Sequence, residues 1–293
     1  MRDEARSEAE RHFGLPAGTF PFESRFCRIG DARLHYVDEG SGPVLFMLHG
    51  NPTWCFVYRH LISALRGNYR CIALDLAGFG LSEAPPQFTF YPQDHARLVA
   101  AFLDTLDLKD TTLIAHDWGG PIGLWAMNAT EDRITRLCLG NTWAWPVNGD
   151  FHFEWFSRLM GGAVGRFLTN HQLAFVNFVM PASMKRRKLS EIEMSTYRAP
   201  FTERSSRKPL YVFPRQITAA HAWLTELESH VRQFKGPACF IWPDGDIAFR
   251  EKELERWRRT LPQAEVGIIK RCGHYLWEDA PDECIAHLRA WCR

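Results

Sequence analysis

The sequence predicts an α/β fold with an eight-stranded, mostly parallel sheet, helices on both faces and a helical cap inserted after the sixth strand. The sheet is predicted because eight short strand-like runs alternate, from the third run onward, with helical stretches. Such alternation is typical of parallel strands that are covered by helices on both faces. The cap is predicted because the alternation stops over residues 141–237, between the sixth and seventh runs.

The first two strand-like runs predict a hairpin, because Gly30 and Asp31 lie at the turn between them. In chain order, the expected strands are 25–29, 33–37, 43–48, 70–74, 111–115, 136–140, 238–242 and 265–270. The expected helices of the core are 55–66, 92–107, 120–129, 217–233, 250–260 and 280–291.

The predicted cap domain comprises residues 146–215, which are rich in Phe, Trp, Met and basic side chains and lack strand alternation. We expect it to cover the carboxyl ends of the strands, the edge where open α/β sheets bind ligands. Residues 1–145 and 216–293 then form the core domain. The basic runs at 185–188 and 256–259 are each interpreted as a solvated helix face.

The composition of the 293 residues excludes several classes of function. The net charge of +1 gives no bulk attraction to nucleic acid or to an anionic membrane. The chain has no run of about 18 apolar residues and begins with a charged stretch, so neither a membrane span nor a signal peptide is expected. The eight scattered cysteines, without a C-x-x-C pair, predict reduced thiols in a cytoplasmic protein.

Asp117 stands at a turn that follows the fifth predicted strand. The stretch from Ala115 to Gly119 has the small-x-nucleophile-x-Gly spacing of a nucleophile elbow. Such a turn presents the nucleophile beside backbone N–H groups at a helix N-terminus, which favours negative charge. The alternative is an ordinary strand-to-helix turn whose Asp caps the helix.

Polar residues after three other predicted strands favour the elbow. The His-Gly-Asn-Pro stretch that contains Asn51 follows the third strand, where an elbow protein places its second oxyanion donor. Asp246 follows the seventh strand and offers an acid, although it could instead cap the next helix; Asp244 is a second candidate. His274 follows the eighth strand and offers a base. The chain order Asp117, Asp246, His274 is nucleophile, acid, base.

These motifs together resemble the α/β-hydrolase superfamily and, within it, the haloalkane dehalogenases, from about residue 22 to the end of the chain. The resemblance is carried by LHGNPTW (48–54), DLAGFGLSE (75–83), HDWGG (116–120), NTWAWP (141–146), FPRQI (213–217), DIAFR (246–250) and GHYLWEDAP (273–281). The most specific feature is the pair Asn51 and Trp118, because in that family these two side chains bind the departing halide.

The acid after strand seven resembles the subgroup with an Asp-His-Asp triad and an Asn-Trp halide pair. Another subgroup places a Glu after strand six, where this chain has Asn141-Thr142-Trp143. Pro243 and Ile247 depart from the family pattern, which usually has Gly and often Pro at these positions. These departures concern the shape of the loop around Asp246.

The resemblance implies hydrolytic dehalogenation of haloalkanes. A carboxylate is ionised at pH 7, so Asp117 can displace a halide from an sp³ carbon and form an alkyl ester. His274, oriented by Asp246, would activate the water that hydrolyses this ester. Neither a metal nor an organic cofactor is expected. The expected partners are a small haloalkane and a halide ion, without nucleic acid or membrane, and the resemblance is compatible with a homo-oligomer.

Two other interpretations stay open. Soluble epoxide hydrolases also use an Asp in an H-D-W-G turn, but they usually carry an aromatic residue where this chain has Asn51. They also need lid tyrosines, for which the predicted cap offers Tyr197 and Tyr211. A ligand-binding receptor or a luciferase-like oxygenase could use the same scaffold, since a fold does not fix a function.

Overall fold

The computed structural model describes residues 6–130 and 132–292, and its centre is a single eight-stranded sheet with the order β1-β2-β4-β3-β5-β6-β7-β8. Strand β2 runs antiparallel to β1 and β4, and all other neighbouring strands are parallel. The predicted α/β sheet is therefore confirmed. The strands are β1 (Arg25–Ile29), β2 (Ala32–Glu39), β3 (Val44–Leu48), β4 (Arg70–Leu74), β5 (Thr111–His116), β6 (Ile134–Gly140), β7 (Ala238–Pro243) and β8 (Glu265–Ile269).

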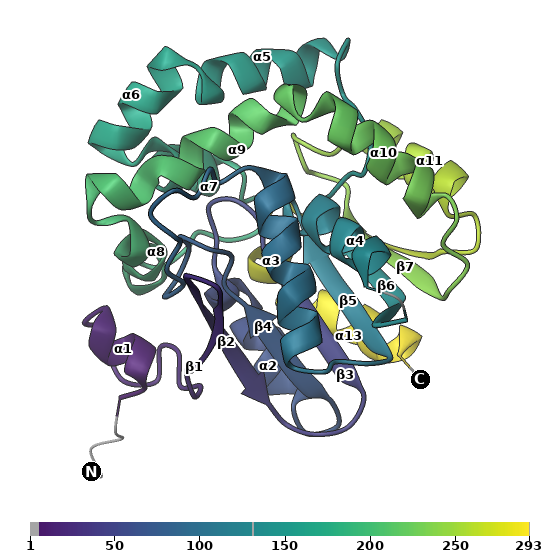
Figure 1. Cartoon of the computed structure of the whole chain (residues 1–293), viewed down its shortest axis with the longest axis horizontal. Helices are drawn as coiled ribbons and strands as arrows, with labels where there is room; N and C mark the ends of the chain where they lie inside the picture. Colours follow the sequence, from purple (N-terminus) through teal and green to yellow (C-terminus); the bar gives the residue numbers. More distant parts are fainter. Residues whose placement is uncertain (1–5, 131, 293) are drawn as a thin grey trace.

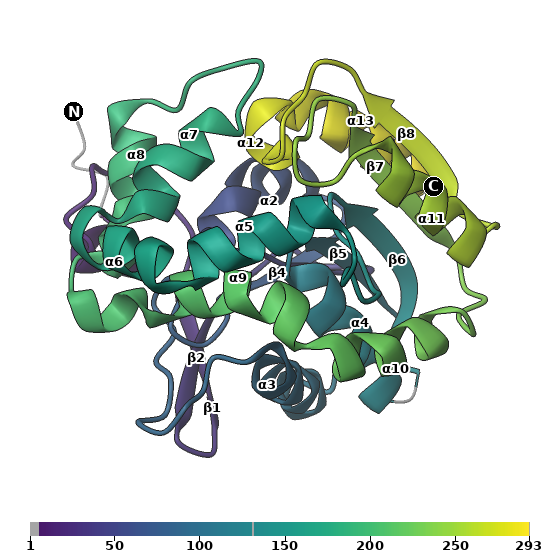
Figure 2. The ribbon, with the colours of Figure 1, turned by 90° about the horizontal axis from the view of Figure 1, so that it is seen from above.

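Helices cover both faces of this sheet, as the sequence predicts. Figure 2 shows α2, α12 and α13 on one side of the strands and α3, α4 and α10 on the other. Every residue of β5 and of β7 is buried between these layers, as expected for central strands of a parallel sheet. The helices of the core are α2 (Arg59–Leu65), α3 (Pro92–Thr105), α4 (Gly119–Ala129), α10 (His221–Val231), α11 (Glu251–Thr260), α12 (Leu276–Asp279) and α13 (Pro281–Trp291), with α1 (Glu8–His12) near the N-terminus and the 3₁₀ helix η1 (Cys55–Tyr58) before α2.

The predicted helical cap is confirmed between β6 and β7, above the strands in Figure 1. Helix α5 packs along α9, and the two backbones approach so closely at Gly161 that a Cβ there would lie 2.5 Å from Arg215 N. The division into domains stays a prediction, and α9 runs through its boundary at residue 215. The cap elements are α5 (Phe151–Gly161), α6 (Ala163–Gln172), the π-helix η2 (Phe175–Val179), α7 (Met180–Ala182), α8 (Glu191–Arg198), η3 (Ala199–Phe201), η4 (Arg204–Arg207) and α9 (Lys208–Ala219).

Two local predictions are wrong. The expected helix over 217–233 is divided at Ala220, whose ψ of 24° is not helical. Ile217 belongs to the cap helix α9 and lines a cavity, whereas Leu224 belongs to α10. The basic run 185–188 is not a helix but an irregular segment between α7 and α8. Its arginines pair with acidic residues of the core instead of facing solvent freely. The second basic run does lie on a helix, α11.

Two further findings concern the chain as a whole. None of the eight cysteines, all of which lie in the described ranges, forms a disulfide, and seven of them are buried. None of the helices in the described ranges combines the length and the apolar character needed to cross a membrane.

Candidate active site

The turn after β5 has the geometry of a nucleophile elbow. Asp117 has a φ of +50°, in the left-handed region that is strained for a residue other than glycine. Its backbone is held on both sides, because its N–H donates to Asn141 O at 3.0 Å and its carbonyl accepts from Thr142 Oγ1 at 2.7 Å. At Gly119 a Cβ would lie 2.0 Å from Leu48 O, so only glycine lets α4 start this close to β3.

The carboxylate of Asp117 points toward the loop after β3. Its Oδ1 accepts the backbone N–H of Asn51 at 2.8 Å, and the approach is so close that a Cβ on Gly50 would lie 2.3 Å from Oδ1. Burial raises the pKa of Asp117, and this effect outweighs the lowering by His274 and by the N–H groups of Trp118 and Asn51. The predicted oxyanion loop and the predicted nucleophile therefore meet.

His274 lies between the two predicted acidic residues. Its Nδ1 is 2.9 Å from Asp246 Oδ2, and its Nε2 is 3.8 Å from Asp117 Oδ2. Asp246 is held in turn by the N–H of Ala248, which donates to its Oδ1 at 2.7 Å. Burial lowers the pKa of His274, but the two carboxylates prevail, so its pKa is raised. Three loops far apart in the sequence thus bring Asp117, His274 and Asp246 together.

Asp244, the second candidate acid, is not at this site. Its Oδ1 accepts the backbone N–H of Arg271 at 2.5 Å, and Oδ2 lies 3.4 Å from Lys270 Nζ. It therefore ties the end of β7 to the loop after β8 rather than orienting His274. The unusual Ile247 lines the mouth of the cavity and is 55% exposed.

Two residues that the sequence did not single out as site residues contact Asp246 and His274. Asn141 Nδ2 donates to Asp246 Oδ2 at 2.5 Å and to His274 O at 3.1 Å. His116 Nε2 lies 2.9 Å from the same carbonyl, and since a carbonyl only accepts, this nitrogen carries the proton. Burial and the nearby His274 keep the pKa of His116 well below its ordinary value. The sequence offers one signal for both residues, which is that each stands at the carboxyl end of a predicted strand.

Asp117 and His274 line a cavity of about 110 Å³ under the cap. Its wall is mostly aromatic and aliphatic, so a ligand inside would have little water around it. Four exposed aromatic residues of the cap, including Phe151 and Trp155, lie outside this wall. The aromatic residues that line it are Trp118, Trp143, Phe153, Phe156, Phe175, Phe249 and Tyr275.

Trp118 and Asn51 both line the cavity beside Asp117. The indole of Trp118 stacks on Phe213 with ring centroids 5.2 Å apart, and no described residue accepts a hydrogen bond from its Nε1. Asn51 Nδ2 donates to Leu210 O in the cap at 3.4 Å. That carbonyl is free because Pro214, one helical turn later in α9, has no N–H. Each side chain thus keeps an N–H available to the cavity.

The tyrosines of the cap lie elsewhere. Tyr197 is fully buried, and its hydroxyl donates to Glu278. Tyr211 lines a separate surface groove between α5 and α9, where Arg166 lies over its ring. Neither belongs to the wall of the cavity, so neither can activate an epoxide oxygen there in this conformation.

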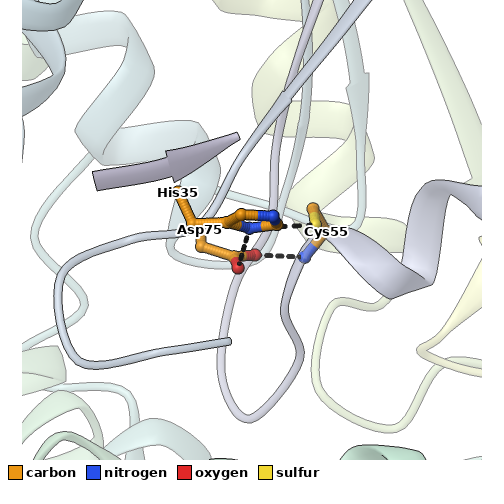
Figure 3. Close-up of side chains that lie close together, drawn as sticks. All are labelled: His35, Cys55 and Asp75. Carbon is orange, nitrogen blue, oxygen red and sulfur yellow. Dashed lines mark hydrogen bonds and ion pairs between the residues drawn. The ribbon is translucent and has the colours of Figure 1, made fainter. Parts of the chain in front are cut away.

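A second cluster of chemistry-bearing side chains, His35, Cys55 and Asp75, is fully buried outside the cavity (Figure 3). Asp75 Oδ2 is 2.7 Å from His35 Nδ1, and Oδ1 accepts the backbone N–H of Cys55 at 2.7 Å. Burial, together with Asp75, raises the pKa of the Cys55 thiol well above its ordinary value, so the thiol stays protonated. These contacts join β2 and β4 to the end of the loop that carries Asn51. The cluster therefore has a structural role.

Comparison with known proteins agrees with this geometry. Residues 43–281 match the family model described as alpha/beta hydrolase fold. This chain is therefore a protein of the alpha/beta hydrolase fold, and it carries a carboxylate at the nucleophile elbow.

Haloalkane dehalogenase 2 of Mycobacterium tuberculosis is 38% identical over 270 residues, which cover 91% of this chain and 94% of that protein. The crystal structure of haloalkane dehalogenase DbeA from Bradyrhizobium elkani USDA94 superposes with a TM-score of 0.84 at 25% identity, covering 92% of this chain and 97% of that chain. The chain belongs to the haloalkane dehalogenase family. Its place in the subgroup with an Asp-His-Asp triad stays a prediction.

A relative with a different name is also similar. Cis-3-alkyl-4-alkyloxetan-2-one decarboxylase of Shewanella oneidensis is 32% identical over 287 residues, which cover 92% of this chain and 88% of that protein. The same fold and a similar sequence thus occur in proteins with two different names.

The pKa of His274 is expected to lie above the ordinary value of 6.5, because Asp246 and Asp117 stabilise the imidazolium. The folded state then binds this proton more tightly than the unfolded state. The resulting stabilisation is fully present below pH 6.5 and is lost as the pH rises through the folded pKa. Asp246→Asn should lower the pKa of His274, as measured by NMR titration of its ring. Asp244→Asn is the matched control and should leave it unchanged; a wild-type pKa at or below 6.5 would contradict this reading.

Proposed function

We propose that this chain hydrolyses haloalkanes to an alcohol, a halide ion and a proton. One observation carries the proposal: a carboxylate stands at the elbow, and beside it in an apolar cavity lies Trp118, whose indole N–H has no hydrogen-bond acceptor among the described residues. A hydroxyl nucleophile would need His274 as its base from the start, whereas an ionised carboxylate does not. The cavity therefore suits displacement at carbon followed by hydrolysis.

In the first step, an oxygen of Asp117 attacks the carbon that bears the halogen. The new C–O bond forms as the carbon–halogen bond breaks, and the halide leaves with the electron pair. The N–H groups of Trp118 and of the Asn51 amide would bind this halide, which needs donors rather than a proton. Such donors act strongly here because the aromatic wall excludes water.

In the second step, His274 takes a proton from a water molecule, and the hydroxide adds to the carboxyl carbon of Asp117. The oxyanion would be held by the backbone N–H groups of Asn51 and Trp118, the first of which already binds Asp117 Oδ1 at 2.8 Å. Collapse breaks the bond to the alkoxy oxygen, and the alcohol leaves with one proton of the water. The other proton is released, and the carboxylate is restored. Asp246 would stabilise the imidazolium formed in between.

A second candidate is decarboxylation of β-lactones, favoured by the identity with the Shewanella oneidensis decarboxylase. Epoxide hydrolysis is less well supported, because Tyr197 and Tyr211 lie outside the cavity. One covalent trapping experiment can compare all three reactions.

His274→Phe should trap the ester on Asp117, because displacement does not use the base and hydrolysis does. The variant is incubated separately with a terminal bromoalkane, styrene oxide and a cis-3,4-dialkyl-oxetan-2-one, followed by intact mass and peptide mapping. Alkyl mass on Asp117 from the bromoalkane is the expected result, and the double variant with Asp117→Ala should show none.

An adduct from the epoxide alone would replace dehalogenation by epoxide hydrolysis. Conversion of the oxetanone by the wild type without bromide release would favour the decarboxylase. If no reagent labels the variant and the wild type releases no bromide, the chain would instead act on another substrate or serve as a binding protein.

Trp118→Phe keeps an aromatic ring but removes the N–H. Cleavage of the carbon–halogen bond should therefore become slower, and the halide ion should bind more weakly. Loss of one such donor typically costs about a hundredfold or more in rate. Pre-steady-state bromide release measures the effect. Trp145→Phe is the matched control, because Trp145 packs on Trp257 away from the cavity. An unchanged rate of bromide release in Trp118→Phe would rule out its role.

The size of the cavity predicts a preference for short substrates. Its volume of about 110 Å³ is smaller than the roughly 150 Å³ cavity that holds benzene, so terminal bromides of about two to four carbons should fit best. Phe156→Ala should shift the optimum of kcat/KM toward longer chains. Phe151→Ala is the control, since this side chain is 80% exposed and should leave the chain-length profile unchanged. A wild-type optimum at six carbons or more would contradict the prediction.

A further inference from the structure

The cap contacts the loop of His274 through the irregular segment 183–187, between α7 and α8. Figure 2 shows this part of the chain reaching over to α12. The contact is made by backbone atoms: Ser183 O accepts the N–H of His274 at 2.9 Å. At Gly273 a Cβ would lie 2.0 Å from Ser183 O, so the backbones of these two segments are in direct contact.

One buried carboxylate joins these two segments. Asp279, the last residue of α12, is 4% exposed. Its Oδ1 accepts the N–H groups of Arg186 and Arg187, at 2.8 and 3.2 Å. Its Oδ2 accepts those of Lys185 and of Gly273, at 3.0 and 2.7 Å. Three consecutive N–H groups of the cap and one of the His274 loop thus share a single side chain, which satisfies its buried charge.

Side chains of the same segment reinforce the contact. Arg187 Nε donates to Glu278 O at 2.7 Å, and its guanidinium pairs with the buried carboxylate of Glu278. Arg187 also pairs with Glu193 of α8, and it prevails with Arg59 over burial to lower the pKa of Glu193 to about 2. These ion pairs keep the segment on α12 but do not touch His274 themselves.

The loop that carries Asp246 is bonded to the same stretch of chain, residues 272–274. The N–H of Gly245 donates to Cys272 O at 2.9 Å, one residue before Asp246. The segment 183–187 therefore holds the stretch 272–274 from one side, while the loop of Asp246 holds it from the other. The hydrogen bonds of Asp117 come instead from residues after β3, β5 and β6.

We infer that Asp279 is a positioning residue through which the docked cap sets the position of His274. The inference rests on the proposed function, in which only the second step uses His274. Loss of Asp279 should therefore slow hydrolysis of the alkyl-enzyme and leave its formation largely intact. A general loss of stability would have no reason to separate the two steps.

The test is Asp279→Asn, which keeps the size of the side chain but turns an NH₂ group toward N–H donors. Rapid-quench kinetics with a terminal bromoalkane give the bromide burst for step one and alcohol release for step two. The burst rate should stay within about threefold of wild type, and hydrolysis should fall by about a hundredfold, as expected for a displacement near 1 Å. Intact mass should then show accumulated alkyl-enzyme. Asp282→Asn is the matched control, since Asp282 is an exposed residue of α13.

A second measurement does not depend on turnover. Hydrogen exchange of the His274 amide, which is bonded to Ser183 O, should become at least tenfold faster in Asp279→Asn and stay unchanged in Asp282→Asn. If Asp279→Asn does not fold, Arg187→Gln, which weakens docking but leaves the backbone donors, should show the same selective slowing of hydrolysis.

Equal slowing of both steps, or unchanged hydrolysis, would overturn the inference, as would an unchanged exchange rate of the His274 amide. Failure of the proposed function looks different, because the wild type itself would then give neither a bromide burst nor alkyl-enzyme. In that case the exchange experiment still decides whether Asp279 positions His274.

Discussion

The role of each buried carboxylate near the site depends on how many hydrogen bonds that carboxylate accepts. Asp75 and Asp279 are surrounded by donors: Asp279 accepts four backbone N–H groups, and the donors around Asp75, His35 first among them, hold its pKa low despite burial. Such carboxylates are stable and unreactive. Asp117 differs, because two backbone N–H groups, those of Asn51 and Trp118, bind its carboxylate, and Oδ2 lies 3.8 Å from His274 Nε2. With fewer donors around it, this carboxylate keeps lone pairs that a nucleophile needs.

The sequence predicts well those residues that carry a local signal. Asp117, Asp246 and His274 each follow a strand, and because parallel strands end at one edge of a sheet, counting strands was enough to bring them together. Asn141 also follows a strand, but its role and that of Asp279 depend on partners from distant segments, which the sequence does not pair. The acidic partners of the run 185–188 are Glu193, Glu278 and Glu283, and composition alone cannot pair them with its arginines.

The cavity wall was harder to predict because helix periodicity does not separate a cavity wall from a helix core. Phe153 and Phe156 face inward while Phe151 and Trp155 of the same helix face solvent, although all four belong to one aromatic run. The contribution of Pro214 is also visible only in three dimensions. A proline inside a helix reads as a breaker, yet here the carbonyl that it frees, Leu210 O, accepts the amide of Asn51.

The two proposed steps place opposite demands on one small cavity. Displacement favours a dry site with a carboxylate of fixed geometry, whereas hydrolysis needs a water molecule and a correctly placed base. The two groups have different direct supports. Asp117 is bonded by residues of the core, whereas His274 is bonded by residues of the core and by Ser183 of the cap. The contact with the cap therefore bears more directly on the base, which acts in the second step, than on the nucleophile.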